Sequence, residues 1–255
     1  MKTLTFFNEK GGVGKSLHTT LFASYLRYRE GARVAVIDLE NPTPRLGPER
    51  ARELRMLSDP GSALSRYMSR HPETPSPYDI FELSGGSPSY DSAYINSLRK
   101  RAWDFVLSRA DEYDYVLFDF PAMLMEESPA FVMIGSGLVD LTVIPFDVDP
   151  VTRKAALMTA VLFQNNEQRV VLLWNNVPAN DLARTGFIEN GEQIYRDHGF
   201  EILPFRIKTF LKAKRDSEER LFVRSSVCWP DRYVRMACPE LLGLYEDLKE
   251  RLDRI

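Results

Sequence analysis

A glycine-rich run near the start of the chain has the residue types and spacing of a phosphate-binding loop. Residues 8–16 read Asn-Glu-Lys-Gly-Gly-Val-Gly-Lys-Ser, after an apolar run at 4–7 and before a helical pattern. Glycines let the loop fold tightly and turn backbone N–H groups toward an anion, and the helix start adds its positive dipole end. A lysine and a serine that end such a loop bind the β- and γ-phosphates and Mg²⁺. The predicted ligand-binding residues of this run and of the position after it are Gly11, Gly12, Val13, Gly14, Lys15, Ser16 and Leu17.

Two apolar runs further along the chain end in acids. The run at 33–37 is followed by Asp38 and Glu40, and the run at 115–118 is followed by Asp119. Parallel strands present ligands at their carboxyl ends, so these acids are expected to face the phosphates. Asp119 is predicted to bind Mg²⁺ through a water together with the loop serine. Asp38 is predicted to hold the water shell of the Mg²⁺, and Glu40 to orient or activate the attacking water.

The elements that must position these residues alternate between strand and helix. This order predicts an α/β fold, a doubly wound and mostly parallel sheet with helices on both faces, as in P-loop NTPases. A chain of 255 residues with 44% apolar composition favours one domain over 1–255. The stretch at about 58–92 is rich in Pro, Ser and Gly and is expected to be a loop-rich insertion. Further strands are expected at 141–145, 170–174 and 201–203, and helices at 17–28, 98–106 and 241–255.

Composition favours a cytoplasmic protein. The net charge of −3 argues against a generally basic nucleic-acid coat protein but leaves room for a local basic patch. The apolar run before the loop is too short for a secretory signal, and no apolar segment reaches the ~18–20 residues of a membrane span. The two cysteines, Cys228 and Cys238, lack zinc-ligand spacing and are too few for a disulfide scaffold.

The loop resembles that of the ParA/MinD family of P-loop ATPases, and within it most closely that of the ParA-type partition ATPases. It departs from G-x-x-x-x-G-K-[ST], because Glu9 stands where the first glycine is expected, and matches the variant K-G-G-x-G-K-[ST] with an upstream lysine, Lys10. The resemblance implies Mg²⁺-dependent ATP hydrolysis linked to an ATP-dependent homodimer, in which Lys10 crosses to the partner's nucleotide. The nitrogenase iron-protein branch is excluded, since no cysteine lies in the middle of the chain.

The resemblance also assigns residues outside the loop. Where the family has Asp-x-Asp followed by Pro-Gln, this chain has Asp38-Leu39-Glu40 followed by Asn41-Pro42, so slow or conditional turnover is expected. An asparagine at the end of the strand near 170–174 contacts adenine in the family. This is Asn175 or Asn176, depending on register, with Asn175 favoured. Residues after the last strand that contact the base through the backbone in the family correspond here to Pro204 and Phe205.

Residues 206–224 form a basic segment, with a net excess of four positive charges in an otherwise acidic chain. A run of charge is usually a solvated face, but nonspecific DNA binding needs several such phosphate contacts. The resemblance places DNA contacts in this region, on the dimer. The possible DNA contacts are Arg206, Lys208, Lys212, Lys214, Arg215, Arg220 and Arg224.

The sequence thus predicts a nucleotide-switched ATPase that partitions or transfers a plasmid, chromosome or conjugative element. Its expected partners are nonspecific DNA and a DNA-bound activating protein. Such a protein would associate with the nucleoid. Two alternatives stay open. One is an ATP-dependent ligase or synthase of small molecules on the same fold, against which Lys10 counts. The other is a MinD-like positioning ATPase, disfavoured because the polar face of the last helix mixes acids and bases, and a membrane-surface helix favours a basic one.

Overall fold

The fold is a seven-stranded parallel sheet with helices on both faces. The computed structural model describes residues 1–40, 44–83, 91–123, 128–178, 185–209, 226–229, 231, 234–235 and 238–255. The strand order is β3-β2-β4-β1-β5-β6-β7, and every neighbouring pair is parallel. The predicted doubly wound α/β fold is therefore confirmed. The strands are β1 (Lys2–Phe6), β2 (Val34–Asp38), β3 (Asp79–Glu82), β4 (Tyr115–Asp119), β5 (Leu141–Phe146), β6 (Val170–Val177) and β7 (Glu201–Lys208).

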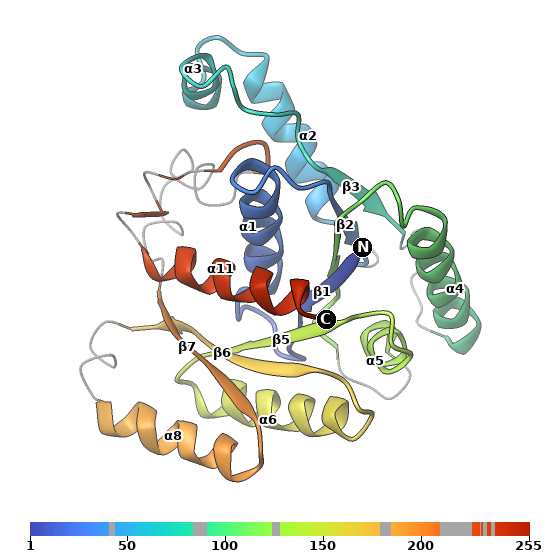
Figure 1. Ribbon diagram of the computed structural model, residues 1–255, viewed down its shortest axis with the longest axis vertical. Helices are drawn as coiled ribbons and strands as arrows, with labels where there is room; N and C mark the ends of the chain where they lie inside the picture. The colour runs from blue at the N-terminus through green and yellow to red at the C-terminus, as the bar shows by residue number, and fades with distance from the viewer. Residues whose placement is uncertain are drawn as a thin grey trace.

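Two layers of helices enclose the sheet because its central strands are apolar on both sides. In β4, Tyr115 and Leu117 pack into one layer, whereas Val116 and Phe118 pack into the other. Helices α1 (Lys15–Tyr28) and α11 (Glu240–Asp253) cover the first face, and the second is covered by α4 (Ser92–Ser108), α5 (Pro129–Gly135), α6 (Pro150–Gln164) and α8 (Thr185–Asp197) (Figure 1).

The stretch at about 58–92 contains regular elements in its described part. Helix α3 (Ala63–Ser69) follows α2 (Leu46–Leu57), and edge strand β3 pairs in parallel with β2. Part of the expected insertion therefore belongs to the main sheet. The strand was not predicted because it has only four residues and both of its ends are exposed, so it carries no buried apolar run.

Helix α11 lies across the sheet, as Figure 1 shows, and contacts β7 and β1. Its apolar side is buried in the core, as expected from its periodicity, through Leu241, Leu244, Tyr245, Leu248 and Leu252. This apolar side is therefore used for packing within the chain. Among the described residues, no helix has both the length and the apolar character that a membrane crossing needs.

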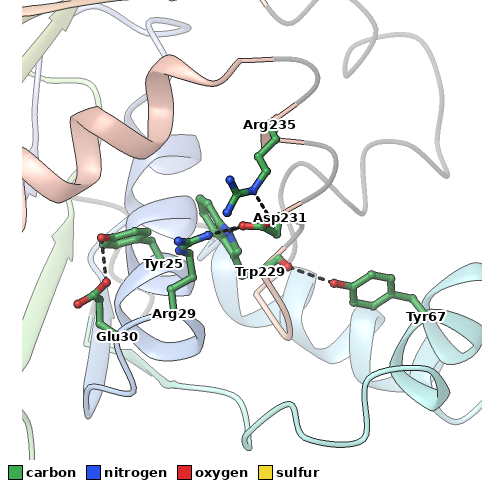
Figure 2. A network of polar contacts seen from close by, with 7 residues as sticks. All are labelled: Tyr25, Arg29, Glu30, Tyr67, Trp229, Asp231 and Arg235. Atoms are coloured by element: carbon green, nitrogen blue, oxygen red, sulfur yellow. Dashed lines mark hydrogen bonds and ion pairs between the residues drawn. The ribbon is translucent and has the colours of Figure 1, made fainter.

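The chain just beyond the basic segment is fastened to the helices beside the sheet. Glu53 of α2, only 4% exposed, accepts hydrogen bonds from the backbone N–H of Ser226 at 3.1 Å. The hydroxyl of Tyr67 in α3 donates to the Trp229 carbonyl, and Asp231 pairs with Arg29, the C-cap residue of α1 (Figure 2). Residues 226–231, where described, thus connect α1, α2 and α3.

Candidate nucleotide-binding site

The phosphate loop joins β1 to α1 and lines a cavity of about 170 Å³. Gly12 and Gly14 have φ angles of 82° and 93°, a left-handed conformation that glycine adopts without steric cost. Gly14 is also the N-cap of α1, and a Cβ there would lie 2.5 Å from the side-chain nitrogen of Asn175. The spacing of the glycines therefore follows from backbone geometry and from the close approach of β6. The cavity is lined by Gly11, Gly12, Gly14, Lys15, Ser16, Leu17, Thr20, Glu40, Arg45, Leu46, Glu49 and Ala122.

Lys15 lies inside this cavity and is only 7% exposed. Its Nζ donates to the Lys10 carbonyl at 2.9 Å, which places the ammonium within the curve of the loop. Burial lowers the pKa of Lys15 to about 8, although the charges of Asp119 and Glu40 work in the opposite direction. A partly desolvated cation held by a glycine-rich loop suits the binding of phosphate oxygens.

Asp119 ends β4, beside Asp38 at the end of β2, and both side chains are fully buried. Neither carboxylate oxygen of Asp119 accepts a hydrogen bond of normal length and angle from any described residue. Burial raises the pKa of Asp119 to about 7, and the nearby Ser16 hydroxyl offsets part of the rise. A buried carboxylate without a partner, next to a hydroxyl, is an unsatisfied set of hard oxygen ligands. These residues fit Mg²⁺, which in proteins uses one or two carboxylates plus phosphates and water.

Asp38 has a different environment, because backbone N–H groups donate hydrogen bonds to its carboxylate. One oxygen accepts from the N–H of Glu40 at 3.0 Å, and the other accepts from the N–H groups of Arg45 and Leu46, each at 2.8 Å. Asp38 therefore joins the end of β2 to the start of α2. These contacts assign it a positioning role, and its predicted role in the water shell of Mg²⁺ stays a prediction.

The charged residues that line the cavity outside the loop are, among those the structure describes, Glu40, Arg45 and Glu49. Glu40 is half-buried, and burial raises its pKa against the opposing charge of Arg45. Sequence reasoning identified Glu40 but missed the other two. No local sequence pattern identifies these two residues, because Arg45 reaches the cavity only through the cap that Asp38 forms on α2.

The two asparagines at the end of β6 both reach the phosphate loop. Asn175, 2% exposed, donates from Nδ2 to the Val13 carbonyl at 2.7 Å. The Asn176 amide reaches the Gly12 carbonyl at a longer 3.4 Å and lies partly exposed, with a φ of 53°. Asn175 thus fixes the loop to the end of β6. A base contact by either asparagine stays a prediction.

We predict that Asn175→Ala lowers the free energy of unfolding by about 1–3 kcal/mol, because it leaves the buried Val13 carbonyl without a donor. The matched control is Asn176→Gly, which keeps the left-handed φ of 53° without strain and removes only a long, partly exposed contact, so its loss is expected to be below about 0.5 kcal/mol. Urea unfolding of both variants measures the difference. Equal losses would contradict the loop-holding role of Asn175.

Pro204 and Phe205 do not follow the last strand, as predicted, but lie inside it. β7 extends to Lys208, and its register with β6 brings Lys208 beside Val177. The Thr209 hydroxyl, just beyond, donates to the Asn176 carbonyl at 2.6 Å. The two predicted residues line a separate pocket of about 540 Å³, away from the phosphate loop. The predicted end of the strand was wrong because only two apolar residues, Ile202 and Leu203, marked the first part of an eight-residue strand, and a base contact by Pro204 or Phe205 stays a prediction.

The described part of the basic segment carries paired charges. Arg206 donates to Glu192 at 3.1 Å, and Lys208 forms an ion pair with Glu240 at 3.2 Å. Both residues lie on edge strand β7. The other predicted DNA contacts, Lys212, Lys214, Arg215, Arg220 and Arg224, lie outside the described residues.

Lys10 lies on the outer side of the loop and is exposed. Its backbone N–H donates to the Asn8 side chain at 2.9 Å, which fixes the turn below it. Lys10 does not line the cavity that holds Lys15. It borders a neighbouring pocket of about 430 Å³, which is also lined by Met123 and by Val151 and other residues of α6. The two lysines of the loop are thus separated: one faces inward and the other outward.

Comparisons with known proteins agree with this fold. A similar fold occurs in the McdA–ATP complex of Cyanothece (18% identity, covering 99% of this chain and 96% of that one, TM-score 0.59). It also occurs in the MinD cell division protein of Aquifex aeolicus (17%, 95% and 98%, TM-score 0.56) and a ParA family ATPase of Chlorobium tepidum (17%, 97% and 98%, TM-score 0.59). No curated protein sequence matches the chain significantly. The model of the CobQ/CobB/MinD/ParA nucleotide-binding domain matches residues 4–252, so the chain belongs to that family.

Proposed function

We propose that this protein is a Mg²⁺-dependent ATPase of the positioning or partition type that works as a nucleotide-switched homodimer. The observation that carries the proposal is the separation of the two loop lysines. Lys15 lines the phosphate cavity, whereas the exposed Lys10 borders a different pocket. A cation directed away from its own nucleotide can act on one bound by a partner, as an arginine finger does in trans. The family match over 4–252 supports a single nucleotide-binding domain.

The chemistry follows from the groups around the cavity. Lys15 and the loop N–H groups would bind the β- and γ-phosphates, while Ser16 and Asp119 would hold Mg²⁺. The ion supplies charge neutralisation between these phosphates. Glu40 would orient a water whose oxygen bonds to the γ-phosphorus as the bond from that phosphorus to the bridging oxygen breaks. The products are ADP, inorganic phosphate and a proton, which Glu40 can accept from the water and release to solvent.

The dimer is tested with Lys10→Ala. We expect this variant to bind ATP with near-normal affinity as a monomer but to lose the ATP-dependent dimer, because its own cavity keeps Lys15. Light scattering after size-exclusion chromatography, with MgATP and with MgADP, measures the association state. Lys154→Ala is the control, since this residue of α6 borders the same outer pocket without belonging to the phosphate loop. A normal dimer in the Lys10 variant would contradict the trans role.

The cargo is proposed to be DNA or a DNA-bound activating protein, and the location the cytoplasm or nucleoid. The basic excess of the segment 206–224 supports this, although Arg206 and Lys208 are paired with carboxylates. Fluorescence anisotropy on nonspecific duplex DNA tests it, with MgATP and with MgADP over a salt series. Binding that needs ATP and weakens steeply with salt would support phosphate contacts. Absence of binding by a protein that still binds ATP would contradict the DNA cargo and leave the ATPase unaffected.

No observation favours the two alternatives over the partition type. The apolar side of α11 is buried in the core, which leaves it little apolar surface to insert into a lipid interface. Sedimentation with anionic liposomes and MgATP would detect a MinD-like activity. ATP turnover that rises only with a small carboxylate substrate would instead identify a ligase or synthase.

A further inference from the structure

The phosphate cavity contains a second cation that the family motif does not account for. Among its described lining residues, the positively charged side chains are Lys15 and Arg45, opposed by Glu40 and Glu49. The triphosphate of ATP carries several negative charges, and one lysine neutralises only part of them. Arginine is well suited to the remainder, because its planar guanidinium donates two parallel hydrogen bonds to phosphate oxygens.

The backbone of Arg45 is held firmly at the cavity wall. Its N–H donates to the buried Asp38 carboxylate at 2.8 Å, next to the equivalent bond from Leu46. Asp38 itself ends a central strand of the sheet. Glu49, one turn further along α2, lines the same cavity. These contacts therefore fix the first turn of α2 so that Arg45 and Glu49 lie at the phosphate cavity.

The guanidinium of Arg45 has no hydrogen bond or ion pair with any residue that the structure describes. Arg50 on the same helix differs, since it donates to the Tyr78 carbonyl and to both the hydroxyl and the carbonyl of Ser226. Arg50 therefore serves the fold, whereas Arg45 is left available for an anion.

The surroundings of Arg45 indicate which phosphate it would meet. Lys15 faces the β- and γ-phosphates in such loops, and Glu40 belongs at the water that attacks the γ-phosphate. Arg45 lines the same cavity as both of these residues. A group that meets Lys15, Glu40 and Arg45 together would be the γ-phosphate, which ADP lacks.

We propose that Arg45 binds the terminal phosphate of ATP within its own chain and makes the site prefer ATP over ADP. The inference rests on the proposed ATPase function and deepens it. In a nucleotide-switched protein, such a residue would set how strongly the bound state depends on the third phosphate.

The test compares Arg45→Gln with Arg52→Gln, a control on an exposed position of α2 outside the cavity. The dissociation constants of the Mg²⁺ complexes of a nonhydrolysable ATP analogue and of ADP are measured by titration calorimetry. In Arg45→Gln we expect the analogue to bind about tenfold more weakly or worse, and ADP to change by less than about threefold. The control is expected to match the wild type for both nucleotides.

Equal losses for the two nucleotides, or no loss, would overturn the role of Arg45. A wild-type protein that binds neither nucleotide would overturn the ATPase proposal and this inference together. A wild type that binds both, a Lys15→Ala variant that binds neither, and an unchanged Arg45→Gln variant would reject the inference alone.

Discussion

Replacing Lys15 with alanine is expected to weaken the binding of MgATP about a hundredfold or more while the protein stays folded. Lys15 is the buried cation of the phosphate cavity, with its Nζ held by the Lys10 carbonyl. Charge-assisted hydrogen bonds to two phosphates contribute roughly 3 kcal/mol together, and each 1.4 kcal/mol is about a factor of ten in affinity. Removal of the buried ammonium relieves its desolvation, and this gain opposes the loss of its hydrogen bond to the Lys10 carbonyl, so the free energy of unfolding of the free protein is expected to change little.

Titration calorimetry with MgATP and MgADP measures this loss, and thermal unfolding without nucleotide checks that the variant is folded. Lys10→Ala is the matched control, because it removes a lysine from the same loop but outside the cavity. A folded Lys15→Ala protein with wild-type affinity would show that the loop does not bind phosphates as assigned.

The pKa of Lys15 adds a pH dependence to the same prediction. Burial lowers this pKa to about 8, and a bound polyanion favours the charged form and raises it again. Above about pH 8, nucleotide binding is therefore expected to take up a proton and to weaken as the pH rises further. Calorimetry in two buffers with different ionisation enthalpies detects the proton, and Lys15→Ala is expected to lose this component.

Replacing Asp119 with asparagine is expected to stabilise the nucleotide-free protein and to reduce hydrolysis of MgATP by about a hundredfold or more. The fully buried carboxylate has no hydrogen-bond partner among the described residues, and its ionisation is disfavoured by burial. A pKa raised from 3.8 to about 7 corresponds to at most about 4 kcal/mol of destabilisation at full ionisation. The neutral amide avoids that cost but cannot replace a carboxylate as a ligand of Mg²⁺.

The stabilisation is expected to depend on pH with a definite sign. Because folding raises this pKa, the protonated form of Asp119 favours the folded protein relative to the ionised form. This contribution to stability is fully present below the unfolded pKa of 3.8 and is lost as the pH rises through about 7. The gain of Asp119→Asn over wild type should therefore be small near pH 4 and reach a plateau above about pH 7. Urea unfolding at several pH values, with and without MgADP, measures it. A variant less stable than wild type at pH 8 without nucleotide would contradict the unpaired carboxylate.

Local features of the sequence already determine much of this protein. The glycines of the loop could be identified because left-handed φ angles and close backbone approach restrict those positions, as at Gly14. The central strands could be predicted because strands buried on both faces read as continuous apolar runs. The acids Asp38 and Asp119 at their ends follow from the same runs, since parallel strands bring their carboxyl ends to one edge.

Only the tertiary structure decided which role each of those residues has. The two aspartates look alike in sequence, but backbone N–H groups of Glu40, Arg45 and Leu46 donate to Asp38, whereas Asp119 is buried and accepts no hydrogen bond of normal geometry from the part of the chain that the structure describes. Arg45 joins the site through that cap, and register places Pro204 inside β7 instead of at its end. These outcomes depend on which distant groups meet in space. Periodicity and turn chemistry are local, so they predict the elements but not the long-range partners of each side chain.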